Sequence, residues 1–308
     1  MSVLRPYYMG FRHYRHGEEE FFSATYMDRF LLLKLWTGEV VASAKLKRPC
    51  GDWCDVSFAS EELVYVADGW RRVQIVDLRT GLARETIAVT EATRVRCGNG
   101  MQVVVTSDSF GPGYVISRSS ARKAAVRDLG DLNGASIPSD RSWLSVAANH
   151  AAGQYHRVDL SSGQVEKRDL PRRLKSCGMY LNEAEGLMVV DYFEGPIECY
   201  DSGLTAVRWT RDLDDGGMRM GSSWTGDGRF FVIGTDKENV HVLEAATGAT
   251  RAVYAASFKP RYAVSGARVM NGSAQIMDVT TGAIDDHRYT VDWWRKYGLF
   301  DARNWGGE

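Results

Sequence analysis

The sequence predicts an all-β fold, a seven-bladed β-propeller of four-stranded antiparallel blades, and two repeated features lead to that prediction. The first is a hairpin. Residues 73–89 read VQIVDLRTGLARETIAV, an apolar run, an Asp-x-x-Thr-Gly turn and an alternating run, which is the pattern of two joined β-strands. The glycine can adopt the positive φ that the loop needs, and the aspartate can accept hydrogen bonds from the backbone of the turn. The second feature is a polar turn followed by an apolar run, upstream of each hairpin.

The hairpin recurs along the chain. Five copies end in a turn of the form x-x-Thr/Ser-Gly, and two degenerate copies fill the gaps, one shortened at Gly203 and one without a glycine at Ser120. The turns fall at residues 38, 81, 120, 163, 203, 248 and 282, at steps of 34 to 45. A propeller blade of four strands takes roughly 40–50 residues, so seven turns predict seven blades.

The apolar runs upstream of the hairpins are expected to form the second strand of each blade. Four of them are apolar at nearly every position: 63–67, 103–106, 187–190 and 230–234. A strand in which apolar and polar residues do not alternate is typical of a position covered on both faces by neighbouring blades.

Together, the apolar strand, the Asp-x-x-Thr-Gly turn, the alternating strand and the polar turn resemble the quinoprotein-like and YVTN-type propeller repeats. The chain is less similar to WD40 repeats, because no blade carries their Gly-His and Trp-Asp signatures. The resemblance covers about residues 20 to 290. It implies a propeller and carries over no functional residue.

The domain organisation follows from the extent of the repeat. Residues 1–291 are predicted to form the propeller, and residues 292–308 an aromatic tail packed on or near the ring, with the alternative that the tail anchors a partner. The last repeat is short before Ser273. We therefore expect a terminal strand, from residues 2–10, to close the ring.

Composition bears on the class of partner. The 38 basic and 39 acidic residues nearly cancel, so no overall field favours nucleic acid or a membrane surface. No apolar segment approaches the ~20 residues of a membrane-spanning helix. The N-terminal residues lack the pattern of a secretory signal and the five cysteines form no paired framework, so we expect a cytoplasmic monomer with reduced thiols.

Metal-ligand types are present, but their spacing is weak evidence for a site. Cys54, Cys97 and Cys177 are expected on or near innermost strands, where small residues packing together is favoured over a metal or redox cluster. The His13 and His16 pair has no nearby third ligand. The run at 212–217 lacks the alternate carboxylates of a calcium loop. We predict no metal site and no cofactor.

No linear catalytic motif occurs in the sequence. The favoured hypothesis is a non-catalytic scaffold that binds another protein with the loop-rich upper face of the propeller, an inhibitor or immunity-type protein being one form. The alternatives are a hydrolase or lyase with a site in the central channel, and a binder of small ligands or carbohydrate that uses the aromatic loops.

The candidate partner contacts are aromatic residues and arginines in upper-face loops, where strand geometry does not require them. Tryptophan, tyrosine and arginine dominate interface hot spots. The alternative is that Trp70 and Phe193 pack against their own blades. The predicted contacts are Trp70, Arg71, Arg72, Phe110, Tyr114, Arg173 and Phe193.

Overall fold

The computed structural model shows an all-β chain, with a single short 3₁₀-helix, η1 (Leu132–Gly134), in the residues that it describes. No helix among those residues has the length and hydrophobicity needed to cross a membrane. The predicted tail at 292–308 and residues 2–9 lie outside the described residues. The described residues are 10–50, 54–89, 92–98, 102–106, 113–117, 123–126, 129–130, 132–148, 152–174, 176–192, 195–213 and 215–285.

The first eight strands form one sheet of two antiparallel four-stranded halves, in the order β1-β2-β3-β4-β8-β7-β6-β5. A single parallel pair, Lys45 with Leu82, joins the halves. The strands are β1 (Gly10–His16), β2 (Glu19–Tyr26), β3 (Arg29–Lys34), β4 (Val40–Lys45), β5 (Asp55–Phe58), β6 (Leu63–Ala67), β7 (Arg72–Asp77) and β8 (Leu82–Ala88).

The following strands form separate antiparallel sheets in chain order, β9–β12, β13–β15, β16–β19, β20–β23 and β24–β27. The three-stranded sheet is extended by an isolated bridge between Ser136 and Ser145 at the position of an innermost strand. These strands are β9 (Arg94–Cys97), β10 (Gln102–Thr106), β11 (Gly113–Ser117), β12 (Lys123–Val126), β13 (Trp143–Ala147), β14 (Gln154–Asp159), β15 (Val165–Asp169), β16 (Ser176–Asn182), β17 (Leu187–Tyr192), β18 (Ile197–Asp201), β19 (Val207–Arg211), β20 (Arg219–Trp224), β21 (Phe230–Thr235), β22 (Asn239–Glu244), β23 (Thr250–Ala255), β24 (Pro260–Val264), β25 (Arg268–Asn271), β26 (Ile276–Asp278) and β27 (Ile284–Asp285).

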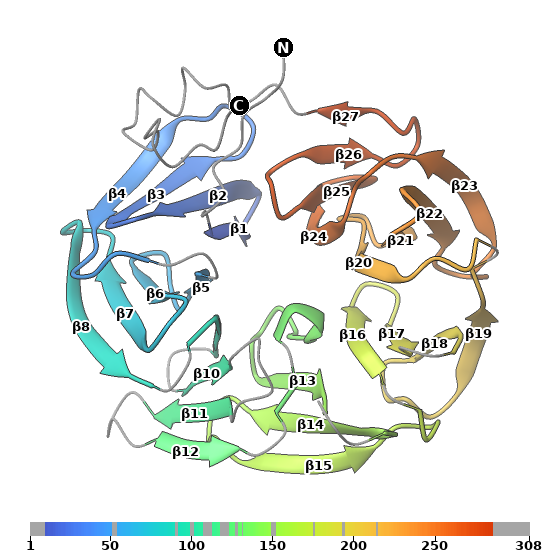
Figure 1. Cartoon of the computed structure of the whole chain (residues 1–308), viewed down its shortest axis with the longest axis horizontal. Coiled ribbons are helices and arrows are strands. Elements are labelled where there is room, and N and C mark those ends of the chain that lie inside the picture. Colours follow the sequence, from blue (N-terminus) through green and yellow to red (C-terminus); the bar gives the residue numbers. More distant parts are fainter. Residues whose placement is uncertain are drawn as a thin grey trace.

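The sheets stand around a common centre like propeller blades (Figure 1). The innermost elements are β1, β5, β9, η1, β16, β20 and β24, and they contact one another in turn around the ring. Each antiparallel sheet places the loop between its second and third strands on one face of the ring, together with the connections between sheets. We call this the upper face, and the opposite face the lower face.

The predicted hairpin turns that fall in the described residues are present, with the predicted backbone chemistry, and the turn at Ser120 lies outside those residues. Gly81 has a φ of 68° and Gly248 a φ of 65°, which only glycine adopts without strain. The shortened turn at Gly203 differs, because there Leu204 takes the positive φ of 60°. The side chain of Asp77 accepts hydrogen bonds from the N–H groups of Arg79 (2.8 Å) and Thr80 (3.1 Å), as expected.

The predicted second strands are also present and are covered on both faces. The run at 63–67 is β6, and the other three lie within β10, β17 and β21. Every residue of β17 and β21 is buried, whereas the outermost β19 buries only Trp209. The apolar side chains of neighbouring sheets meet in shared clusters, and these clusters form the core between sheets.

The ring closes by packing of side chains between the first and last sheets. Phe22 and Leu33 of the first sheet share an apolar cluster with Val264, Met270 and Ile276 of the last. The predicted terminal strand from residues 2–10 lies, apart from Gly10, outside the described residues, so the donated strand stays a prediction. Gly10 begins the innermost strand of the first sheet, and the four strands of the last sheet all come from residues 260–285. The short stretch before Ser273 nevertheless holds two strands, β24 of five residues and β25 of four.

Candidate functional site

The loop between β6 and β7 holds three of the predicted partner contacts on the upper face. The Asp68 side chain is buried, and its Oδ1 accepts hydrogen bonds from the N–H groups of Trp70 (2.9 Å), Arg71 (2.9 Å) and Arg72 (3.0 Å). The loop also pairs with the next connection, where Ala92 N–H donates to the Trp70 carbonyl (2.9 Å). One aspartate and a neighbouring strand connection therefore fix the backbone of this loop.

Despite its fixed backbone, the loop presents its side chains to solvent. Trp70 exposes 63% of its surface, more than any other large hydrophobic residue among the described ones. Arg71 and Arg72 are exposed, and neither forms an ion pair with a described residue. The alternative that Trp70 packs against its own sheet does not fit this exposure.

The other predicted contacts divide into three groups. Arg173 is exposed in the connection between β15 and β16. It lies against the loop before β14, because a Cβ on Gly153 would come within 2.6 Å of the Arg173 Cα. Tyr114 is half-buried in β11 and packs against the cluster between the β5–β8 and β9–β12 strands, so part of its role is structural. Phe110 and Phe193 lie outside the described residues.

Three exposed methionines on the same face were not predicted as contacts. Met27 is 43% exposed in the turn between β2 and β3, Met218 is 57% exposed before β20, and Met220 is 37% exposed at the start of β20. A search for aromatic residues and arginines overlooks methionine, although its flexible thioether suits adaptable interfaces. In the sequence, these methionines could have been recognised as contacts by their positions in or beside upper-face loops.

The acidic connection at 212–217 is held by hydrogen bonds within the protein. The Oδ2 of Asp215 accepts from Thr235 Oγ1 (3.0 Å) and Asn239 Nδ2 (3.0 Å) and lies 2.9 Å from His241 Nε2. Burial would raise the pKa of Asp215, but hydrogen bonds from His241, Asn239 and neighbouring groups outweigh it and hold that pKa well below its usual range. This carboxylate positions the loop that carries Met218.

A charged cluster lies on the innermost strands at the centre of the ring. The Asp55 carboxylate lies 2.5 Å from Arg12 Nε and 2.8 Å from Arg96 Nη1. Burial would raise the pKa of Asp55, but the guanidinium groups of Arg12 and Arg96 outweigh it and hold that pKa well below its usual range. Along the chain, Asp55 is 43 residues from Arg12 and 41 residues from Arg96, so no local pattern in the sequence pointed to this cluster.

The predicted cysteine positions agree with the structure. Cys54 directly precedes β5, Cys97 ends β9 and Cys177 lies in β16. Cys50, Cys54 and Cys97 are buried with free thiols. In the part of the chain that the structure describes, no three histidine, cysteine or acidic side chains gather where they could hold a metal ion.

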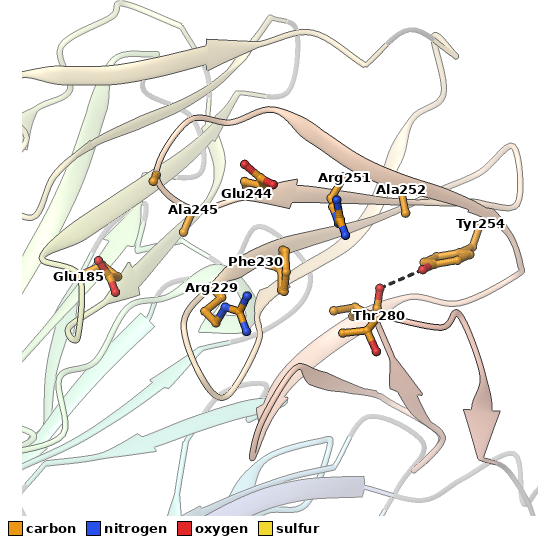
Figure 2. A pocket seen from close by; sticks show the side chains of 11 residues that line it. Glu185, Arg229, Phe230, Glu244, Ala245, Arg251, Ala252, Tyr254 and Thr280 are labelled. Atoms are coloured by element: carbon orange, nitrogen blue, oxygen red, sulfur yellow. Dashed lines mark hydrogen bonds between the residues drawn. The ribbon is translucent and has the colours of Figure 1, made fainter.

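A cavity of about 540 Å³ lies on the lower face between the β20–β23 and β24–β27 sheets. Figure 2 shows Arg229 and Arg251 near Phe230, and Tyr254 bonded across to the next sheet. The Tyr254 hydroxyl donates to the Val279 carbonyl at 3.0 Å. Glu185 and Glu244 also line this cavity, so its charges balance and favour no class of ligand.

Comparison with known proteins shows the fold of this chain. No family model and no curated protein matches the sequence. Among solved structures, Hsv2 of Kluyvelomyces marxianus superposes with a TM-score of 0.66 at 13% identity, over 93% of this chain and 99% of that one. The Cps50 (Swd1) β-propeller domain of Myceliophteria thermophila gives 0.62 at 10% identity, over 89% and 98%.

A third structure is similar over most of its length. Hydrazine synthase of Kuenenia stuttgartiensis gives a TM-score of 0.60 at 12% identity, over 92% of this chain and 96% of that chain. The three neighbours confirm the predicted β-propeller. At these identities the likeness concerns the fold alone.

Proposed function

We propose that this protein is a non-catalytic scaffold that binds another protein with the upper face of its propeller. The observation that carries the proposal is Trp70, whose backbone is fixed by Asp68 while 63% of its surface faces solvent. A preorganised exposed tryptophan loses little conformational entropy on binding, because its loop is ordered before the partner arrives. Tryptophan is also among the residues that most often dominate interface energetics.

The exposed arginines of the upper face favour a partner with acidic groups around an apolar pocket. Arg71, Arg72 and Arg173 are exposed on the same face. Arginine pairs with carboxylates through two parallel hydrogen bonds, which gives both affinity and orientation. The exposed Met27 and Met218 would extend the apolar contact toward the first and sixth hairpin repeats.

We also propose that the ring has seven blades, with the innermost strand of one blade reduced to the bridge at Ser136. Two features support this count. The eight-stranded sheet consists of two antiparallel halves held by one parallel pair. In addition, the apolar core divides into seven clusters, each shared between consecutive groups of strands.

The test is capture of the native partner by the full chain and by two variants. The first variant combines Trp70→Ala, Arg71→Ala and Arg72→Ala on the upper face. The second combines Arg229→Ala and Arg251→Ala on the lower face as a matched control. Tyr114 is left unchanged because it packs against the core. A central hot spot contributes ~2 kcal/mol or more, about thirtyfold in affinity, so the upper-face variant should lose capture entirely.

The melting temperature separates loss of binding from loss of fold. Exposed substitutions rarely cost more than ~0.5 kcal/mol each, so both variants should melt within a few degrees of the parent. Equal capture by the parent and the upper-face variant would refute the proposal. Loss of capture in the lower-face variant alone would move the interface to the opposite face.

A further inference from the structure

The connection from β4 to β5 joins the two halves of the first sheet on the upper face, and it carries two cations that the interface proposed above does not use. Lys47 and Arg48 are both exposed in it. The N–H of Cys50 donates to the Met27 carbonyl at 2.8 Å, so the connection lies against the turn between β2 and β3. Met27 is itself 43% exposed. The two cations therefore lie near an exposed apolar side chain.

A buried glutamine fixes the backbone of this connection. Gln74 lies in β7 with none of its surface exposed. Its Nε2 donates to the Arg48 carbonyl at 2.9 Å, and its Oε1 accepts from the Arg48 N–H at 3.2 Å. On the other side, Lys47 Nζ donates to the Arg84 carbonyl of β8 at 2.7 Å. The connection is thus ordered before a partner arrives, which reduces the conformational entropy lost on binding.

The strand that carries Gln74 also brings Arg72 to this connection. Side chains two residues apart in a strand lie on the same face of the sheet, so Arg72 shares the face on which Gln74 reaches Arg48. Arg72 begins β7 and Arg71 precedes it, and both are exposed. The strip of cations leads from the β4–β5 connection to the loop between β6 and β7. We call it the basic strip, and its members are Lys47, Arg48, Arg71 and Arg72.

Three acidic residues of the surrounding turns and strands do not neutralise the basic strip. Asp68 is buried, and one of its oxygens accepts three N–H groups of its own loop. Asp28 lies 3.8 Å from Lys45. Glu85 is opposite Ile75, which packs toward the β9–β12 strands, so Glu85 lies on the face away from the connection. No member of the strip forms an ion pair with a described residue, and its positive charge therefore attracts anions.

The rest of the molecule favours a protein over a nucleic acid as the anionic partner. The sequence pI is about 6.6, whereas nucleic-acid-binding domains are usually strongly basic. Arginine pairs with carboxylates through two parallel hydrogen bonds. At the end of the basic strip, Trp70 exposes 63% of its surface, and an apolar side chain of a protein can cover it. The strip and Trp70 together suit a segment that carries both carboxylates and an apolar residue.

We propose that the basic strip binds an acidic segment of the partner protein, with the carboxylates paired to the strip and an apolar side chain against Trp70. This inference rests on the protein interface proposed above, and it adds the β4–β5 connection to that interface and the chemistry of the partner. Because the cations are exposed, salt screens their attraction for carboxylates. The affinity for the segment therefore falls as the salt concentration rises.

The probe for this site is a fluorescent peptide of glutamate and aspartate around a single leucine, titrated with the full chain and followed by anisotropy. A peptide with glutamine and asparagine in place of the acids is the uncharged control. A single-stranded oligonucleotide of matched charge and vesicles that contain phosphatidylserine test the other anionic partners. We expect the acidic peptide to bind most tightly of the four. Its affinity should fall about tenfold between ~0.01 M and ~0.15 M salt, as the Debye length shortens from ~30 Å to ~8 Å.

Two double variants locate the site. Lys47→Gln with Arg48→Gln should weaken binding of the acidic peptide by about tenfold, because an exposed ion pair contributes up to about fivefold in affinity. Its melting temperature should stay within a few degrees of the parent, because the Gln74 bonds go to the backbone. Lys167→Gln with Arg208→Gln removes the same charge from exposed positions on β15 and β19. This control should bind within about twofold of the parent, because its charges lie on other strands.

Three results would overturn the proposal. The first is equal affinity for the acidic peptide and its uncharged control. The second is equal binding of the acidic peptide by the two double variants. The third is tighter binding of the oligonucleotide or the vesicles than of the acidic peptide, which would assign the basic strip to that class of partner.

Capture of the native partner separates this proposal from the protein interface on which it rests. The Lys47→Gln and Arg48→Gln variant should capture the partner more weakly than the parent. Undiminished capture by this variant, with capture lost in the Trp70, Arg71 and Arg72 variant, would keep the protein interface and reject the acidic segment. Undiminished capture by both variants would reject both proposals.

Discussion

At the scale of single residues, the aspartates of the hairpin turns were predictable because their partners are local. Asp159 accepts from the N–H groups of Ser161 (2.9 Å) and Ser162 (2.8 Å), and Asp278 accepts from Thr280 (2.9 Å). The Ser161 hydroxyl and these N–H groups lower the pKa of Asp159 to about 2. The sequence shows such an interaction directly, since donor and acceptor are two or three residues apart.

Glu20 shows why interactions between distant side chains were missed. Its partners His13, Trp36 and Ser265 come from β1, from the turn after β3 and from the turn after β24. Ser265 is 245 residues away along the chain. A repeat period identifies which strands exist, but it does not say which side chains of the first and last sheets meet.

The environment of Glu20 predicts a specific dependence of stability on pH. Burial would raise the pKa of Glu20, but hydrogen bonds from His13 and Ser265 lower it from 4.5 to about 2. A carboxyl whose pKa is depressed in the folded state contributes stability above its unfolded pKa, and that stability is lost as pH falls from about 4.5 toward 2. Between pH 6 and 3 the loss should be about 2 kcal/mol, by the linkage relation.

The Glu20→Gln variant should lack this pH-dependent contribution to stability. Its free energy of unfolding, measured in urea at several pH values, should fall less steeply with acid than that of the parent, by about 2 kcal/mol over the same range. Glu85→Gln, on the exposed face of β8, is the control and should follow the parent. Parallel curves for the parent and Glu20→Gln would show that the carboxylate is not stabilised by its partners.

At the scale of elements, the turn glycines have a second role that the sequence did not reveal. At Gly81, Gly248 and Gly282 they allow the hairpin turn to approach the outermost strand of the preceding group of strands. A Cβ on Gly248 would lie 2.5 Å from the Trp209 ring, and a Cβ on Gly282 would lie 2.5 Å from the Tyr254 ring. The positive φ was predictable from the turn pattern, but the close approach was not, because it joins consecutive repeats about 30–40 residues apart.

The aromatic partner also bonds to the next turn. Trp209 Nε1 donates to the Ala245 carbonyl at 2.7 Å, and the Tyr254 hydroxyl donates to the Val279 carbonyl at 3.0 Å. Both carbonyls precede the turn glycine by three residues. The contact therefore fixes the spacing of the β16–β19, β20–β23 and β24–β27 sheets at their outer edges, where none of their described strands pair with one another.

We predict that Trp209→Ala destabilises the protein by about 3–5 kcal/mol, as removal of large buried aromatics usually does. Trp209 is 7% exposed, whereas its neighbour Val207 on the same strand is 53% exposed. Val207→Ala is therefore the control, and should cost less than ~0.5 kcal/mol. Urea denaturation measures both. Similar small losses in the two variants would mean that the contact between sheets contributes little.

At the scale of the whole molecule, the sequence predicted a β-propeller but not which side chains meet between the first and last sheets. The repeat period and the residues of the turns were sufficient to predict a propeller, because each repeat carries its own hairpin. Closure depends on contacts between the two ends of the chain, which no repeat contains. In the structure, Phe22 and Leu33 meet Val264 and Met270 in a cluster as buried as those between other sheets.

We call the interface between the first and last sheets the seam. Because core packing closes it, the seam should be as stable as any other interface of the ring. Met270 in the seam and Leu144 between the β9–β12 and β13–β15 sheets are both fully buried. Met270→Ala and Leu144→Ala should therefore each cost about 2–5 kcal/mol, with a single unfolding transition. Tryptophan fluorescence and far-ultraviolet circular dichroism, followed in urea, should give coincident curves for both variants. A loss below ~1 kcal/mol for Met270→Ala alone, or curves that separate only in that variant, would show that the first and last sheets part before the rest of the ring unfolds.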